Sequence, residues 1–220
     1  MLLTPRLPPK LDALFPRLGA TVVELAQAVV PINHVRRRVL DGLAAVIAEG
    51  EPGGTDLLLV CTHNSRRSHV AMIWAAVAAH LYGFERVDTY SGGTAVTAFN
   101  PRAIAALSRA GFEVQVPRGD NPHVRVEYGP ALATHPCYSK PYDDPANPQS
   151  DYVAVMTCAD ADANCPYLPA ARRRVPLRYR DPGHADDSEG EAAAYAGLVR
   201  QVGRELLFVF AKARGLIGTQ

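Results

Sequence analysis

The 220-residue sequence predicts an α/β fold in which helices cover both faces of a four-stranded parallel β-sheet. Short apolar runs typical of buried strands occupy residues 57–60, 87–91, 152–157 and 175–179. Apolar residues recur at helical spacing after the first, second and fourth of these runs. Because strands alternate with helices, we expect a parallel sheet that binds its ligands at the carboxyl ends of the strands.

Composition excludes several functional classes. The 23 basic and 22 acidic residues give a net charge of +1, so no nucleic-acid partner is expected. No apolar run is long enough to span a membrane, and the N-terminus lacks the charged start and apolar core of a secretory signal. Four cysteines without such a signal indicate reduced thiols with chemical roles in the cytoplasm.

Residues 1–55 are expected to form an N-terminal helical extension ahead of the core fold. Apolar positions in 22–30 predict a short helix that ends near Pro31, and a second helical pattern covers 34–49. The consecutive Arg36, Arg37 and Arg38 are expected on the solvated face of the second helix. The extension is expected to cover either the core or a partner subunit.

Residues 61–68, Cys-Thr-His-Asn-Ser-Arg-Arg-Ser, join the first strand to a helix. A loop that leads into a helix N-terminus directs backbone N–H groups and the positive end of the helix dipole at one small volume, which suits a tetrahedral oxyanion. Arg67 can add a two-pronged contact, and these charges favour a nucleophilic thiolate at Cys61. The alternative is a buried structural cysteine beside an unrelated basic loop. The joint occurrence of cysteine, arginine and serine at this spacing favours the oxyanion site.

This run resembles the phosphate loop of low-molecular-weight protein tyrosine phosphatases and of the arsenate reductases that share their fold. Thr62 and Ser65 are more similar to the reductase version. The resemblance implies a left-handed backbone at Asn64 and a hydrogen bond between Ser68 and the Cys61 thiolate. It implies an oxyanion site formed by Thr62, His63, Asn64, Ser65, Arg66, Arg67 and Ser68. His63 is a departure, because these families commonly carry glycine there.

The next segment also follows the family. A strand at 87–91 is closed by Gly92 and Gly93, which allow the chain to turn near a ligand site. A helix then begins at Asn100 and Pro101 and stops at Gly111.

Residues 113–150 are expected to form a long loop insertion, because they are rich in proline and show little periodicity. Such loops often serve as lids or binding surfaces. Cys137 is expected to be an incidental thiol at the surface, since a metal site with His135 would need further ligands.

The third strand, at 152–157, leads into Cys158, and Cys165 follows in front of a proline. A zinc site is the alternative to a redox pair, but zinc ligands are usually closer together and no second pair exists. The segment resembles the redox segment of thioredoxin-coupled arsenate reductases in its cysteine spacing and in the proline. The resemblance therefore implies a redox pair.

The strand expected at 175–179 ends at Asp181 and Pro182. In the family, an Asp-Pro pair after this strand supplies the general acid, which implies that role for Asp181. The rival, Asp144, comes too early in the chain. Gly183 stands where tyrosine phosphatases usually have an aromatic residue, so a small oxyanion is favoured over phosphotyrosine. A long helix, capped by Ser188, closes the chain.

Together these features imply a thiol-dependent arsenate reductase at residues 56–220, with the resemblance covering about 56–213. Cys61 attacks arsenate, Asp181 protonates the departing oxygen, Cys158 attacks Cys61, and Cys165 transfers the disulfide to thioredoxin or a similar dithiol. No metal or organic cofactor is expected; Met72 also replaces the acidic residue of a potassium site found in some family reductases. The alternatives are a phosphatase that hydrolyses phosphate monoesters and, less favoured, a non-catalytic anion-binding module.

Overall fold

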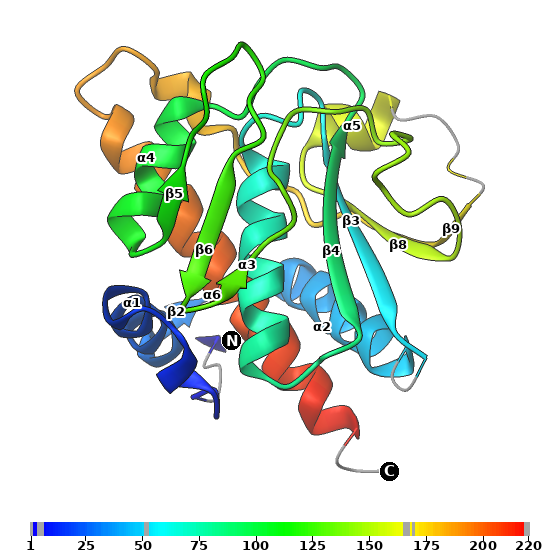
Figure 1. The fold of residues 1–220 in the computed structure, drawn as a ribbon. Helices are drawn as coiled ribbons and strands as arrows, with labels where there is room; N and C mark the ends of the chain where they lie inside the picture. The colour runs from blue at the N-terminus through cyan, green and yellow to red at the C-terminus, as the bar shows by residue number, and fades with distance from the viewer. Residues whose placement is uncertain (1, 4–6, 51–52, 165–167, 169, 218–220) are drawn as a thin grey trace.

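A four-stranded parallel β-sheet forms the centre of the structure, a computed structural model that describes residues 2–3, 7–50, 53–164, 168 and 170–217 (Figure 1). Its strand order is β4-β3-β8-β9, and every neighbouring pair runs parallel. This arrangement confirms the predicted fold class. The strands are β3 (Thr55–Cys61), β4 (Val87–Gly93), β8 (Tyr152–Met156) and β9 (Ala171–Val175).

Helices cover both faces of this sheet, because the side chains of β3 are apolar on both. Leu57 and Leu59 belong to the larger buried cluster with α3 and α6, whereas Leu58 and Val60 belong to a smaller cluster that contains Ala161 of α5. The helices are α1 (Pro16–Gln27), α2 (His34–Gly50), α3 (Arg67–Leu81), α4 (Pro101–Ala110), α5 (Ala159–Asn164) and α6 (Glu191–Ile217), with short 3-10 helices η1 (Leu11–Ala13) and η2 (Pro182–Ala185).

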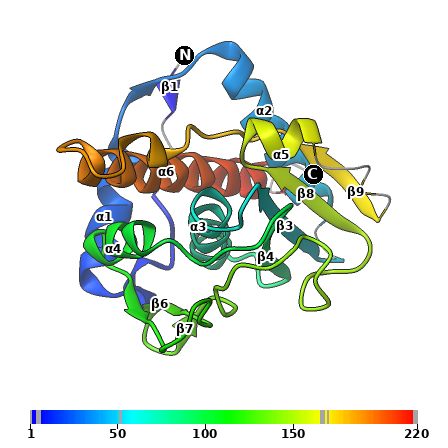
Figure 2. The same cartoon turned by 90° about the horizontal axis from the view of Figure 1, so that it is seen from above.

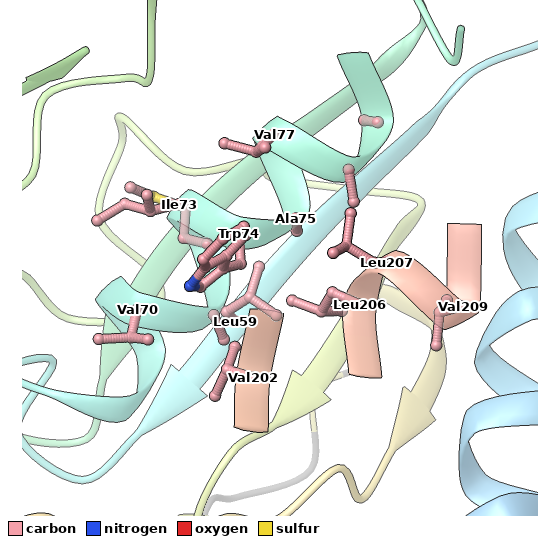
Figure 3. Close-up of a cluster of buried hydrophobic side chains, with 14 of the residues drawn as sticks. Leu59, Val70, Ile73, Trp74, Ala75, Val77, Val202, Leu206, Leu207 and Val209 are labelled. Carbon is pink, nitrogen blue, oxygen red and sulfur yellow. The ribbon is translucent and has the colours of Figure 1, made fainter. Parts of the chain in front are cut away.

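The helix α3 lies at the centre of the larger core, and almost all of its residues are buried. Figure 3 shows Trp74 and neighbouring α3 side chains gathered in one cluster with Leu59 of β3 and the apolar stripe of α6. The Trp74 side chain is fully buried and meets the ring of Phe112 edge-on. This packing fixes the N-terminal end of α3, which borders the loop at residues 62–66.

The N-terminal extension contains both predicted helices, but α1 begins at Pro16 and ends at Gln27, before the end expected near Pro31. Leu18 of α1 and Leu40 of α2 are fully buried in the same cluster as α3 and α6, so the extension is packed onto the core. A short antiparallel pair, β1 (Leu2–Leu3) with β2 (Val30–Pro31), accompanies it. The domain boundary at residue 55 stays a prediction. Within the described residues, none of the helices combines the length and the apolar character needed to cross a bilayer.

Part of the 113–150 insertion is more ordered than expected. It contains a three-stranded antiparallel sheet of order β5-β6-β7, and Figure 2 shows α3 between α6 and this small sheet. The expectation of a pure loop was wrong because such short strands, bounded by glycines and prolines, leave no periodic pattern long enough to detect. The strands are β5 (Glu113–Gln115), β6 (Arg125–Gly129) and β7 (Leu132–Ala133).

Two expected boundaries near the C-terminus are also wrong. The fourth strand lies at Ala171–Val175, before the expected 175–179, because Pro176 has no N–H group for the sheet and the chain leaves the ladder there. Val175, Leu177 and Tyr179 remain buried, which explains the strand-like alternation. The helix α6 begins at Glu191, and Ser188 does not cap it; the Ser188 hydroxyl donates to the Ala185 carbonyl instead, over 2.7 Å.

Candidate active site

The loop at residues 62–66 joins the carboxyl end of β3 to the N-terminus of α3. Asn64 has a left-handed backbone with φ of 42°, as the resemblance implied. The fully buried Asn64 side chain accepts a hydrogen bond from the Lys140 backbone N–H over 2.9 Å. The loop is therefore held in a fixed curve in front of the first turn of α3, whose free N–H groups and dipole favour an anion.

Gly93, at the end of β4, allows this loop to lie close to the sheet. A Cβ atom at position 93 would lie 2.7 Å from the Asn64 nitrogen and 2.7 Å from the Thr62 carbonyl oxygen. Real Cβ atoms do not approach backbone atoms so closely, so any side chain would displace the loop. The glycine pair that the sequence places after the second strand thus has a definite packing role beside the site.

Cys61, the last residue of β3, is buried with its sulfur 3.0 Å from the Ser68 hydroxyl oxygen. The Asn64 side-chain amide donates to the same hydroxyl oxygen over 2.9 Å. Because that oxygen already accepts a hydrogen bond from Asn64, the Ser68 hydrogen is free to point at the sulfur. Such a hydrogen bond would hold the Cys61 sulfur in place beside the loop.

Arg67 and Asp181 lie together at the edge of the loop. Arg67 Nη2 donates to Asp181 Oδ2 over 2.7 Å, and Arg67 Nη1 donates to the Tyr179 carbonyl over 3.4 Å. Arg67 Nε is buried and has no hydrogen-bond partner among the described residues. A buried guanidinium N–H without a partner is costly, so this group is available to an oxyanion in the loop.

Arg66 makes different contacts from its neighbour. Its Nε donates to the Tyr195 hydroxyl over 2.8 Å, and its Nη2 donates to Asp186 over 2.9 Å. A Cβ atom at residue 183 would lie 3.0 Å from the Arg66 guanidinium carbon, so Gly183 leaves room for this side chain. The side chain of Arg66 therefore ties the loop to α6 and to the segment after Asp181.

The other loop side chains mainly hold the backbone in place. The Ser65 hydroxyl donates to the Ala98 carbonyl over 2.6 Å. His63 is exposed, and its carbonyl accepts a hydrogen bond from the Ser139 hydroxyl over 2.8 Å. This arrangement accommodates a side chain where the family commonly has glycine, because the imidazole faces solvent.

Four residues that support the loop were missed by sequence reasoning: Ser139, Lys140, Asp186 and Tyr195. Ser139 and Lys140 belong to the insertion at 113–150, where no local pattern distinguishes them from other loop residues. Asp186 and Tyr195 are linked to each other by a 2.8 Å hydrogen bond. Partial burial opposes ionisation of Asp186, but the Tyr195 hydroxyl and the charges of Arg66 and Arg102 lower its pKa overall.

Cys158 lies beside the loop because β8 is the neighbour of β3. The backbone N–H of Thr157 donates to the Val60 carbonyl over 2.7 Å, which aligns the ends of the two strands. The fully buried Cys158 sulfur is 3.4 Å from the hydroxyl oxygen of Thr62, the residue after Cys61. The Ala161 N–H, in the first turn of α5, donates to the same sulfur over 3.3 Å.

The remaining cysteines differ in what the structure shows. Cys165 lies outside the described residues. Cys137 is fully buried in the larger core, so the expectation of a surface thiol was wrong. Burial is the main cause that raises the pKa of Cys137 to about 12, which leaves it an unreactive thiol. No group of three or more histidine, cysteine or acidic side chains placed to hold a metal occurs within the described part of the chain.

His69, just after Ser68, is buried behind the loop and packs against the tilted ring of Phe99 with 4.2 Å between ring centroids. Its Nε2 lies 3.2 Å from the Tyr138 carbonyl oxygen. Burial, followed by the nearby charge of Lys140, lowers the pKa of His69 to about 3. His69 is therefore a neutral packing residue, and it takes no part in proton transfer near neutral pH.

Comparison with known proteins decides the family. "Arsenate reductase 2" of Staphylococcus epidermidis is 30% identical to this chain over 133 residues, which cover 60% of this chain and 82% of that protein. The chain belongs to the arsenate reductase family with the low-molecular-weight phosphatase fold. "Arsenate reductase" of Bacillus licheniformis is 26% identical over 144 residues, covering 66% of this chain and 86% of that protein. "Arsenate reductase" of Staphylococcus aureus is 28% identical over 133 residues, covering 60% and 82%. No protein-family model matches the chain.

In this member of the arsenate reductase family, the predicted site residues come from separate segments and lie at the carboxyl edge of the sheet. Cys61 ends β3, Arg67 begins α3, and Cys158 follows β8. Asp181 is the N-cap of η2, and its Oδ1 accepts a hydrogen bond from the Gly183 N–H over 3.0 Å. The cap holds the Asp181 carboxylate in one orientation while its other oxygen contacts Arg67.

Proposed function

We propose that this protein is an arsenate reductase in which Cys61 is the nucleophile and Cys158 supplies the second thiol. Arsenate occupies the loop formed by residues 62–67, with the Arg67 guanidinium and the N-terminus of α3 opposing its charge. The family membership supports the substrate, and the placement of Cys158 beside Thr62 carries the choice of a reductive chemistry.

The first step forms a bond between sulfur and arsenic. The Cys61 thiolate attacks arsenic(V), and one arsenate oxygen leaves as water after protonation by Asp181. The position of Asp181 supports this role: its Oδ2 accepts a hydrogen bond from Arg67 Nη2 over 2.7 Å, at the edge of the loop. The product is a Cys61–arsenic(V) thioester, and no electrons have yet reached arsenic.

The second step reduces arsenic. The Cys158 thiolate attacks the Cys61 sulfur, and the electron pair of the sulfur–arsenic bond passes to arsenic, which leaves as arsenite. Two thiols have then become one Cys61–Cys158 disulfide, and the two electrons that they lose are the two that arsenic gains. The Ala161 N–H donates to the Cys158 sulfur and holds it beside the loop. No metal or organic cofactor is required, since both electrons come from thiols.

The third step restores Cys61. Cys165 attacks the Cys158 sulfur, which frees Cys61 and forms a Cys158–Cys165 disulfide that thioredoxin or a similar dithiol reduces. The helix α5 (residues 159–164) lies between these two cysteines in the chain. This chemistry requires reduced thiols, so we propose a cytoplasmic location.

The test compares Cys158→Ser and Cys165→Ser variants with the wild-type protein in two assays. Arsenate reduction should be lost in both variants under steady-state turnover with thioredoxin as reductant. Hydrolysis of 4-nitrophenyl phosphate, if the wild type shows any, should be retained, because it needs only Cys61, Arg67 and Asp181. Unchanged arsenate reduction in both variants would contradict the proposed relay.

A phosphatase is the second candidate, and one observation favours it: Cys61, Arg67 and Asp181 are sufficient for hydrolysis through a phosphocysteine. In that reaction Asp181 first protonates the leaving oxygen and then activates water. The buried position of Cys158 beside the loop has no role in such a reaction except to protect Cys61 from oxidation. Phosphate-ester turnover with no arsenite formation would favour this candidate.

A further inference from the structure

Arg36 links the N-terminal extension to the segment that carries Asp181. It lies in the first turn of α2, and its guanidinium uses all three nitrogens. Nε and Nη2 donate to the two carboxylate oxygens of Glu205 on α6, over 3.0 Å and 2.5 Å. Nη1 donates to the carbonyl of Arg178 over 2.8 Å. One side chain of the extension therefore contacts both the long closing helix and the chain just before Asp181.

The segment at 178–179 is fixed from three directions. The Arg36 guanidinium lies 4.7 Å from the centre of the Tyr179 ring, in a cation–π contact. The Tyr179 N–H donates to the Thr157 carbonyl over 2.9 Å, and the Tyr179 carbonyl accepts a hydrogen bond from Arg67 Nη1. Arg67 thus has two contacts in this segment, the Tyr179 carbonyl and the Asp181 carboxylate.

We propose that Arg36 is a positioning residue for the reaction: it fixes the backbone at 178–181 and thereby keeps Asp181 and Arg67 in place at the oxyanion loop. The inference rests on the proposed function in so far as Asp181 and Arg67 act on the oxyanion. It gives the N-terminal extension a part in the chemistry. Misplacement of a catalytic group by about 1 Å can cost a hundredfold in rate, so a remote support of this kind has a measurable effect.

The neighbouring arginines make different contacts, which separates Arg36 from a general effect of charge. Arg37 pairs with Asp41 one helical turn later, over 2.9 Å, and lies over the ring of Phe208. Arg38 is exposed to solvent. The sequence-based expectation that all three lie on a solvated face was therefore wrong for Arg36, because helical spacing does not reveal an acidic partner 169 residues away. It was also wrong for Arg37, because that side chain covers the Phe208 ring of α6.

Arginine suits this position better than lysine. The Glu205 carboxylate is almost fully buried, and a planar guanidinium can satisfy both of its oxygens while a third nitrogen reaches the Arg178 carbonyl. An ammonium at this position could keep the charge but would lose two of the three directed contacts. Lysine at position 36 therefore tests the geometry separately from the charge.

The experiment compares Arg36→Lys and the double variant Arg36→Met with Glu205→Gln against wild type, with Arg38→Met as the matched control. The double variant removes both charges, so no buried carboxylate is left without a partner. Thermal unfolding first checks that each variant is folded. We then measure arsenate reduction as kcat and KM separately, the rate of Cys61 alkylation by iodoacetamide, and amide hydrogen exchange across 177–186.

For the folded double variant we expect kcat to fall about ten- to a hundredfold and exchange at 177–182 to rise, with Cys61 alkylation within about twofold of wild type. The kcat and the exchange rate of Arg36→Lys should lie between those of the double variant and those of the wild type. Arg38→Met should match the wild type in both. Unchanged kcat and unchanged exchange in the folded double variant would overturn the proposal, as would a loss of kcat that merely follows the unfolding temperature. If the wild type reduces no arsenate, the proposed function fails, but exchange at 177–182 still tests the support by Arg36.

Discussion

The sulfur of Cys158 lies 3.4 Å from the hydroxyl oxygen of Thr62, although the two residues are 96 positions apart in the chain. The contact exists because β3 and β8 are neighbours in the sheet and end at the same edge. It places a second thiol beside the residue that directly follows Cys61. The same edge also carries Asp181 and Arg67, so the loop at residues 62–66 and the second thiol lie in one small region.

Replacement of Thr62 by valine should slow the proposed attack of Cys158 on Cys61, the step that forms their disulfide and releases arsenite. The substitution removes the hydroxyl that contacts Cys158 while keeping the shape, and one lost hydrogen bond corresponds to a rate change of about five- to tenfold. Arsenite release in a single turnover measures the effect. Thr62→Ser retains the hydroxyl and serves as the control; equal rates in the two variants would show that the contact is incidental.

Gly93→Ala should disrupt the oxyanion loop. The new Cβ would lie 2.7 Å from the Asn64 nitrogen, so the loop must shift, at a cost of about 1–3 kcal/mol in the free energy of unfolding. Phosphate protection of Cys61 against alkylation should weaken accordingly. Gly197→Ala on α6 is the control, because nothing lies within 4 Å of its added Cβ. Normal protection in Gly93→Ala would argue against a rigid loop.

Asp162→Asn should expose Cys158. Asp162, on α5, pairs with Arg174 over 3.1 Å and also with Arg178, and these contacts hold the helix against the chain around β9. Loss of charge-assisted hydrogen bonds of this kind should raise the alkylation rate of buried Cys158 about tenfold. High salt should raise the wild-type rate in the same direction.

The control for this prediction is Asp160→Asn, an exposed residue on the same helix. Its alkylation rate at Cys158 should match that of the wild type. If both asparagine variants react alike, α5 is not held through Asp162.

His69 should make stability depend on pH. Its pKa is about 3 in the folded state and about 6.5 in the unfolded chain, so the unfolded state binds more protons between these values. The stabilisation by neutral His69 is fully present above pH 6.5 and is lost as the pH falls. Between pH 6.5 and 5 the free energy of unfolding should decrease by up to about 1.4 kcal/mol per pH unit.

Denaturant unfolding of His69→Gln against wild type measures this effect, and the variant should show a flatter dependence over the same range. His63→Gln, at an exposed position, should keep the wild-type slope. An identical slope in all three proteins would mean that His69 is protonated without cost in the folded state.

Local patterns predicted the features that depend on nearby residues. The strand and helix around Cys61 and the turn at the glycine pair after the second strand follow from short-range rules, and the structure shows each of them. The left-handed Asn64, which the family resemblance implied, is also present. The strand that precedes Cys158 was placed correctly for the same reason. The parallel sheet then brings Cys61 and Cys158 to one edge.

Long-range partners could not be predicted. Arg36 and Glu205 form their pair only after α2 and α6 pack together, and Arg66 contacts Tyr195 across 129 positions. The fourth strand was predicted too late in the chain, because the residues after Pro176 alternate between buried and exposed as in a strand but do not pair with the sheet. Ser139 supports the loop from within an insertion that has no periodic pattern.

The most direct test of the thiol relay traps its first disulfide. Cys165→Ser, reacted with one equivalent of arsenate without a reductant and then quenched by alkylation, should yield one arsenite and a peptide pair linked through Cys61 and Cys158 in mass spectrometry. The wild type should instead show Cys158 linked to Cys165, with Cys61 alkylated. Arsenite formed without any disulfide at Cys158, or a disulfide at Cys137 in its place, would contradict the account.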